Sequence, residues 1–466
     1  MNQPHNPRSN TVVAERPDRV RSTRIDDAAR RPRWRRLLPL CAVALLLLPT
    51  LAACGFGDDD DPGDERTGKI TWYQGVPPEN VDALPAGAGV LPTADPSQQQ
   101  QPPVATQQPA AESSPTVTPP PAETPTPQPT PLPIVTNTIL TDEQIALYQP
   151  NELGSVPVLM YHNIVTEYGS GEEGDVLFRT VNELIGDLQW LYDHDFYVVT
   201  MEEYITNRIS APAGKHPVVI VFDDSRPSQF YYNVEANGSL TFDPNSAVAI
   251  LEEFFASHPD FGHTAVFAVI PIHCFDYEEP SQTPFCQQKL QWLVNNGYEV
   301  ANHTWDHQDL GDVSNETFQE KVGETALWLQ EQTGVESAGT ALILPYGVFP
   351  EGENLQQQWK WIRNGFDYNG QHIKLLTVLA AGADPAPAPS SINFDAMSIA
   401  RIGAKDFPKD GEADRFLDYW FGQFEQNPES LYTSDGHPDT ITIPGGYAGM
   451  LDEEKVAAQG KQVIEY

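Results

Sequence analysis

The sequence is poor in cysteine, in basic side chains and in long apolar runs. It has 4 cysteines in 466 residues, and no two of them are spaced C-x-x-C, which argues against a thiolate zinc site. Lysine and arginine total 27 against 65 aspartates and glutamates, for a formal net charge of −38. So acidic a chain is not expected to bind nucleic acid or an anionic membrane surface directly.

The few basic residues gather at the N-terminus. Residues 1–36 contain 10 arginines and 4 acidic residues, a net charge of 10 − 4 = +6. The apolar run that follows, LLPLCAVALLLLPTLAAC, is too short and too interrupted by proline for a comfortable membrane span. A basic segment before a short apolar core is typical of an export signal, so we predict a signal peptide over residues 1–53.

The end of this run, Leu51-Ala52-Ala53-Cys54, resembles the lipobox of bacterial lipoproteins. The resemblance implies cleavage before Cys54 and lipidation of that cysteine. We therefore expect an extracytoplasmic protein that contacts the bacterial cell membrane through a lipid anchor at Cys54. The alternative is an ordinary signal peptide or anchor with an incidental cysteine.

Two cysteines remain after the predicted signal and its anchor. Cys274 and Cys286 lie twelve residues apart in the loop-like stretch HCFDYEEPSQTPFC. An oxidising compartment would permit a disulfide between them, and two free thiols are the alternative.

Residues 54–136 contain few large apolar side chains and many Pro, Thr, Gln and Ala residues. A segment of this composition cannot bury enough surface to offset its loss of conformational entropy on folding. We expect a disordered tether, and about 80 residues of flexible coil reach roughly 50 Å.

From residue 137 apolar segments alternate with amphipathic ones. The expected strands are 156–162, 196–200, 216–224, 263–271, 298–303, 340–347 and 375–382, and the expected helices are 181–195, 245–258, 287–297 and 314–334. This alternation predicts a parallel α/β fold, as a barrel or a doubly wound sheet. Polar residues at the ends of several strands favour the barrel. We expect the catalytic domain over 137–405, with 406–466 as a C-terminal extension on or near it.

Three short segments carry the chemistry: FDDS at 222–225, HTWDH at 303–307 and LPYG at 344–347. Histidines four residues apart share one face of a helical turn, so His303 and His307 can reach one ion. One carboxylate and two imidazoles suit zinc, and Asp224 is the expected third ligand. Asp223 is then left to accept a proton from the attacking water.

These segments, with VPVLMYHNI upstream, resemble the polysaccharide deacetylases of the nodulation-protein type over residues 155–405. The resemblance implies a distorted, incomplete parallel (β/α) barrel that removes N- or O-acetyl groups from a polysaccharide with a divalent metal. It makes Asp223 the general base and Asp224, His303 and His307 the metal ligands. The backbone N–H of Tyr346 would help to hold the oxyanion.

The sequence departs from the family pattern in three places. Ser225 replaces the usual glycine after the aspartates, and Ile343 stands where many members have an arginine that orients the base. Arg401, near a late strand, is our candidate for that missing role. A general acid is not evident, because His437, the last histidine of the chain, lies in a Gly/Pro/Asp turn rather than behind a strand. Separately, His162 in MYHNI can point into the site or be a core histidine.

We therefore expect a metal-dependent hydrolase, with zinc as the expected ion, that deacetylates a cell-envelope or extracellular polysaccharide. Two alternatives remain open. One is a carbohydrate-binding lipoprotein without turnover, suggested by the missing arginine and general acid. The other is a metal-dependent amidohydrolase of non-sugar amides.

Overall fold

The computed structural model describes residues 134–170, 172–173, 175–405 and 416–466. The predicted signal peptide, Cys54 and the predicted tether up to residue 133 lie outside the described residues. The predicted start of the C-terminal extension, 406–415, lies outside them too.

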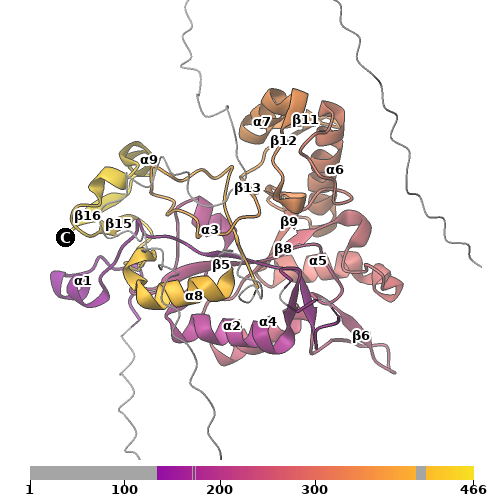
Figure 1. The fold of residues 1–466 in the computed structure, drawn as a ribbon, viewed down its shortest axis with the longest axis horizontal. Helices are drawn as coiled ribbons and strands as arrows, with labels where there is room; N and C mark the ends of the chain where they lie inside the picture. The colour runs from indigo at the N-terminus through magenta and orange to yellow at the C-terminus, as the bar shows by residue number, and fades with distance from the viewer. Residues whose placement is uncertain (1–133, 171, 174, 406–415) are drawn as a thin grey trace, which may run out of the picture. The chain divides into compact units, whose positions relative to one another are not determined.

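A sheet of parallel strands forms the centre of the described fold (Figure 1). Its strand order is β13-β10-β9-β8-β5-β1-β14. The strands are β1 (Val158–Tyr161), β5 (His216–Phe222), β8 (Val266–Val269), β9 (Glu299–Asn302), β10 (Ala341–Ile343), β13 (Thr377–Leu379) and β14 (Ile402–Gly403). The predicted strand segments are all present, because each is a short apolar run that is buried on both faces.

The sheet curls into a distorted, incomplete barrel, as predicted. Among the described residues, isolated bridges connect the two ends of the sheet: Leu379 of β13 with Ile399, and Gly382 with Ile402 of β14. A further parallel strand, β4 (Phe196–Val198), pairs with the first residues of β5. The Val198 N–H donates to Phe261 O at 2.8 Å, so β4 also contacts the segment that precedes β8.

Alternation along the strands separates the barrel interior from the helix-covered outside. In β5, Val219 and Val221 belong to an interior cluster of mostly small apolar residues, whereas Ile220 and Phe222 pack against the helices. Since side chains alternate with period two, the next inward position after Val221 is residue 223. The alternation of side chains along β5 therefore directs Asp223 into the barrel.

The predicted helices are confirmed as α2 (Val181–Asp193), α4 (Ala247–Ser257), α5 (Cys286–Asn295) and α6 (Asn315–Thr333). Thr180 caps α2 with a capping box, in which Glu183 returns a bond to the cap backbone. Gly334 ends α6 in the left-handed conformation that glycine adopts readily, with φ +74°. Two short helices complete this part, α3 (Met201–Ile205) and α7 (Leu355–Asn364).

The two ends of the described chain pack together beside the barrel. In this region α8 (Leu417–Gln426) stacks Phe421 on Trp190 of α2, with ring centroids 3.8 Å apart. The remaining elements here are α1 (Asp142–Tyr148), α9 (Glu453–Ala458) and the parallel pair β15 (Thr440–Ile443) and β16 (Gln462–Glu465). Three further strand pairs lie in the connections: β2 (Asn163–Val165) with β3 (Phe178–Thr180), β6 (Tyr232–Val234) with β7 (Leu240–Phe242), and β11 (Phe366–Tyr368) with β12 (Gln371–Ile373).

A search of the described residues finds no helix with the length and apolar character that a bilayer crossing requires.

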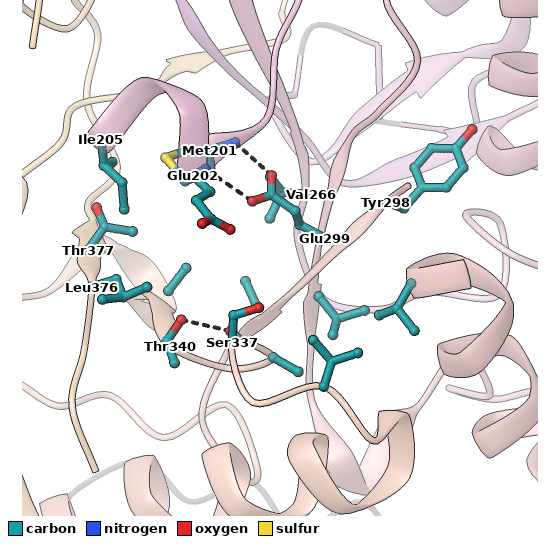
Figure 2. Close-up of a pocket in the computed structure, with 16 residues that line it drawn as sticks. Met201, Glu202, Ile205, Val266, Tyr298, Glu299, Ser337, Thr340, Leu376 and Thr377 are labelled. Atoms are coloured by element: carbon teal, nitrogen blue, oxygen red, sulfur yellow. Dashed lines mark hydrogen bonds between the residues drawn. The ribbon is translucent and has the colours of Figure 1, made fainter. Parts of the chain in front are cut away.

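A pocket of about 140 Å³ lies at the amino ends of the strands and is lined by Glu299, Ala341 and Thr377 among others (Figure 2). Glu299 accepts hydrogen bonds from the backbone N–H groups of Met201, at 2.6 Å, and Glu202, at 3.1 Å. Its carboxylate therefore satisfies the first amides of α3. None of the predicted site residues lines this pocket, so the candidate site must be sought at the other ends of the strands.

Candidate metal centre and active site

Four polar residues stand at inward positions next to barrel strands: three of them directly follow a strand and one directly precedes a strand. Asp223 follows β5, His162 follows β1, His303 follows β9, and Arg401 directly precedes Ile402 of β14. Each lies an even number of residues from an apolar side chain that faces the barrel interior, such as Val221 or Ala301. Asp223, His303 and Arg401 are each at most 2% exposed. Parallel strands thus gather these groups at one end of the barrel.

The predicted metal ligands come together beside them. Nε2 of His303 lies 3.3 Å from Oδ1 of Asp224, and Nε2 of His307 lies 3.5 Å from the same oxygen. One ligand atom from each of these residues lies within 4.8 Å of the other two. A carboxylate and two imidazoles are a common donor set for zinc and leave room for a water or substrate ligand. The three residues therefore fit a divalent ion.

The two histidines do not share a helical turn, so that part of the prediction is wrong. Residues 303–307 form an irregular loop after β9 in which Thr304 and His307 have φ angles of +61° and +60°. The Thr304 N–H donates to Asn302 Oδ1, at 2.9 Å, which stabilises the loop. The rings of His303 and His307 converge, with centroids 4.8 Å apart, because the loop turns back rather than because of helical periodicity.

Hydrogen bonds and charge prepare His303 and its neighbours for a cation. Nδ1 of His303 is 2.8 Å from Ile343 O, which leaves Nε2 facing Asp224. Burial lowers the pKa of His303, but Asp224 and Asp223 outweigh burial and raise it overall. Burial and the charge of His303 lower the pKa of His307 to about 4, so that its ring is neutral at neutral pH. Asp223 and Asp224 therefore favour a positive charge beside them, and the neutral imidazole of His307 is available next to it.

Asp223 is paired with Arg401, the residue proposed to replace the missing family arginine. Nη1 of Arg401 donates to Asp223 Oδ1 at 2.7 Å, and its Nε donates to Ala380 O at 2.9 Å. Burial raises the pKa of Asp223, but Arg401, His303 and His162 outweigh burial and place it below its usual value. Asp223 is therefore ionised at neutral pH and held in one orientation. Arg401 was the sequence-based candidate for this role, but the two residues are 178 positions apart, so their contact depends on the fold.

His162 belongs to the same cluster, which the sequence alone left undecided. Its Nε2 lies 3.8 Å from Asp223 Oδ2. Its buried Nδ1 has no hydrogen-bond partner among the described residues. Burial lowers the pKa of His162 below its usual value, and Asp223 and Asp224 only partly oppose this. The alternation in VPVLMYH was the signal that could have placed it, because Val158 and His162 share the inward parity.

Tyr346 lies in a tight turn after β10. Its φ is +58°, its side chain is 67% exposed, and its ring centroid lies 4.6 Å from that of His307. In the described part of the chain, no backbone acceptor takes its N–H. The Tyr346 N–H stays the predicted oxyanion donor, in a turn that lies beside the candidate metal ligand His307.

Two other candidates are placed as follows. Within the described residues, His437 forms its hydrogen bonds in its own turn: its N–H donates to Asp435 Oδ1 at 2.8 Å, and its Nδ1 accepts from the Asp439 N–H at 3.2 Å. It is therefore outside the cluster. Cys274 and Cys286 are joined in a disulfide.

Comparison with known proteins supports the resemblance. Residues 211–358 match the family described as polysaccharide deacetylase, a segment that contains Asp223, Asp224, His303, His307 and Tyr346 but neither His162 nor Arg401. No curated protein matches the chain.

Among solved structures, the Streptococcus pyogenes deacetylase PplD in complex with acetate is 19% identical, with a TM-score of 0.39, over 54% of this chain and 92% of that one. BC0361, a polysaccharide deacetylase from Bacillus cereus, is 18% identical, with a TM-score of 0.38, over 53% of this chain and 64% of that one. A de-N-acetylase from Aggregatibacter actinomycetemcomitans is 16% identical, with a TM-score of 0.36, over 53% of this chain and 94% of that one.

Proposed function

We propose that this protein removes N- or O-acetyl groups from a cell-envelope or extracellular polysaccharide, because residues 211–358 match the polysaccharide deacetylase family, hydrolases of acetyl amide or ester bonds. The observation that carries the proposal is the cluster of Asp224, His303 and His307 beside the ionised Asp223. A site for one cation next to a carboxylate base can activate a water for hydrolysis of an acetyl group.

Asp224, His303 and His307 would hold the ion, with zinc as the expected metal. Such an ion would act as a Lewis acid and lower the pKa of a water in the site. Asp223 takes a proton from the attacking water, and Arg401 keeps its carboxylate ionised and oriented. As the water oxygen bonds to the acetyl carbonyl carbon, the Tyr346 N–H donates to the developing oxyanion.

His162 supplies the general acid in this scheme. It is neutral at rest because burial lowers its pKa, and it lies 3.8 Å from Asp223 Oδ2. The proton that Asp223 has taken can therefore pass to His162 after a small approach, and from there to the leaving amine or alcohol. Breakage of the C–N or C–O bond then gives acetate and the deacetylated sugar.

The test is acetate release from acetylated chitin oligomers, peptidoglycan and xylan by the purified protein, after chelation and after zinc is restored. We expect zinc-dependent release that D223N abolishes and that H162Q reduces by roughly 10²–10⁴-fold. The matched control is H263Q, since His263 pairs with Glu252 at 2.7 Å outside the cluster. Zinc binding with no release from any polymer would favour a carbohydrate-binding protein. Release from small acetylated amides alone would favour an amidohydrolase.

We also propose that the protein is anchored outside the cytoplasm through a lipid on Cys54. The lipobox-like LAAC sequence supports this, and the Cys274–Cys286 disulfide suits an oxidising compartment. Labelled palmitate should enter the wild-type protein but not C54A, and C54A should leave the membrane fraction. Unchanged membrane retention of C54A would contradict the anchor.

A further inference from the structure

A sharp turn after the aspartate pair brings Arg226 back onto a predicted metal ligand. Asp224 and Ser225 both have positive φ angles, +79° and +45°. As a result Nε and Nη2 of Arg226 lie 3.3 and 3.2 Å from Oδ2 of Asp224. The other oxygen, Oδ1, is the one that faces His303 and His307. The two carboxylate oxygens of Asp224 are thus divided between the guanidinium and the imidazoles.

The guanidinium is itself held in place. It stacks over the ring of Tyr277, 4.2 Å from the ring centroid, in the loop between β8 and α5. Ser225 ties this loop to the turn: its Oγ donates to His273 O at 2.8 Å, and its carbonyl accepts the Phe275 N–H at 2.8 Å. The disulfide from Cys274 closes the same loop. The side chain of Arg226 is therefore held against Tyr277, in a loop that is itself restrained, and has fewer conformations open to it than an ordinary surface side chain.

Two effects of Arg226 on a bound cation oppose one another. Its positive charge disfavours a second cation nearby, whereas its bonds to Oδ2 keep Oδ1 directed at the ion without further loss of side-chain entropy. A partly exposed arginine that acted only through charge would weaken metal binding. An arginine that orients the ligand would strengthen it.

We propose that Arg226 is a positioning residue for Asp224, holding Oδ2 so that Oδ1 is presented to the metal, and that Tyr277 supports it. This rests on the proposed function only in that an ion occupies the Asp224, His303 and His307 site. It requires no particular polysaccharide.

The experiment measures the affinity of the chelator-stripped protein for Zn²⁺ by competition with a chromophoric chelator, together with the visible spectrum of the Co²⁺-loaded protein. We expect R226M to weaken zinc binding by roughly 10–100-fold, the usual loss for an outer hydrogen-bond partner of a metal ligand. R226K should be nearly as weak, because lysine lacks the planar fork and the stacking on Tyr277. Y277L should lose less, and R226M/Y277L should be no weaker than R226M. The Co²⁺ spectrum of R226M should also change.

R363M is the matched control, because Arg363 pairs with Asp395 at 3.1 Å and lies over Trp359 at 5.4 Å, away from the cluster. Thermal unfolding of the metal-free variants identifies any folding defect, and Y277L tests the proposal if R226M does not fold. Tighter or unchanged zinc binding by R226M, or full recovery by R226K, would overturn the positioning role. Failure of the wild type to bind zinc would overturn both this proposal and the metal centre. Zinc binding without acetate release would contradict the proposed function alone.

Discussion

Removing Arg401 should leave the carboxylate of Asp223, the candidate base, as a buried charge without its partner. Arg401 is 1% exposed and Asp223 is 2% exposed, so neither charge can be solvated when its partner is lost. Breaking a buried ion pair by removing one partner costs roughly 3–5 kcal/mol, chiefly because the remaining charge is left uncompensated. R401M, which has a similar length and no charge, should lower the free energy of unfolding by that amount.

The size of the thermal shift follows from the size of the folded region. About 320 residues are described, and at roughly 2.1 cal/mol/K per residue the unfolding entropy is about 0.7 kcal/mol/K. A loss of 3–5 kcal/mol then corresponds to a Tm lower by roughly 4–7 °C. Calorimetry on metal-free R401M, D223N and the double variant would measure this decrease in Tm. Because the double variant leaves neither charge unpaired, it should be more stable than either single variant.

The same variant should change the pH dependence of catalysis. The guanidinium of Arg401 helps to hold the pKa of Asp223 below its usual value, so its removal should move the acidic limb of kcat/KM toward higher pH. A Tm for R401M within 1 °C of wild type, or a double variant as unstable as the worse single variant, would refute the buried-pair reasoning.

Three further predictions concern the stability of the fold. Burial lowers the pKa of Lys289 to about 7, so the unfolded state binds more protons between about pH 7 and 10. K289M should therefore be more stable than wild type by roughly 4 kcal/mol at pH 7 in urea titrations, and this advantage should shrink as the pH rises. An equal advantage of K289M at pH 7 and pH 10 would contradict the lowered pKa of Lys289. The Cys274–Cys286 disulfide closes a loop with a sequence separation of 12, so C274S/C286S should lower the free energy of unfolding by about 3 kcal/mol. An unchanged urea midpoint would contradict this prediction. Gly347 has φ +70°, and a Cβ there would lie 2.5 Å from Ala381 N; G347A should cost roughly 1–3 kcal/mol in the same titrations, and a neutral result would show that the turn can relax.

The sequence alone was sufficient for the architecture and for most of the cluster. Apolar runs such as VVIVF can be buried on both faces only in a parallel sheet covered by helices, so strand and helix positions follow from local pattern. Asp223, Asp224 and His303 could be named in advance because they follow such runs and parallel strands place their carboxyl ends together, and His307 because it lies four residues after His303.

Only the tertiary structure decided which distant residues complete the cluster. Arg401 pairs with Oδ1 of Asp223 across 178 positions of sequence, and His162, which directly follows β1, lies 3.8 Å from Oδ2 of the same carboxylate. The loop at 303–307 also shows that a four-residue spacing can bring two rings together without a helix, because backbone turns with positive φ achieve the same convergence. Contacts of this kind depend on the closure and shear of the barrel. Hydrophobic periodicity determines which residues are buried, but it does not determine which buried polar groups from separate strands come to face one another.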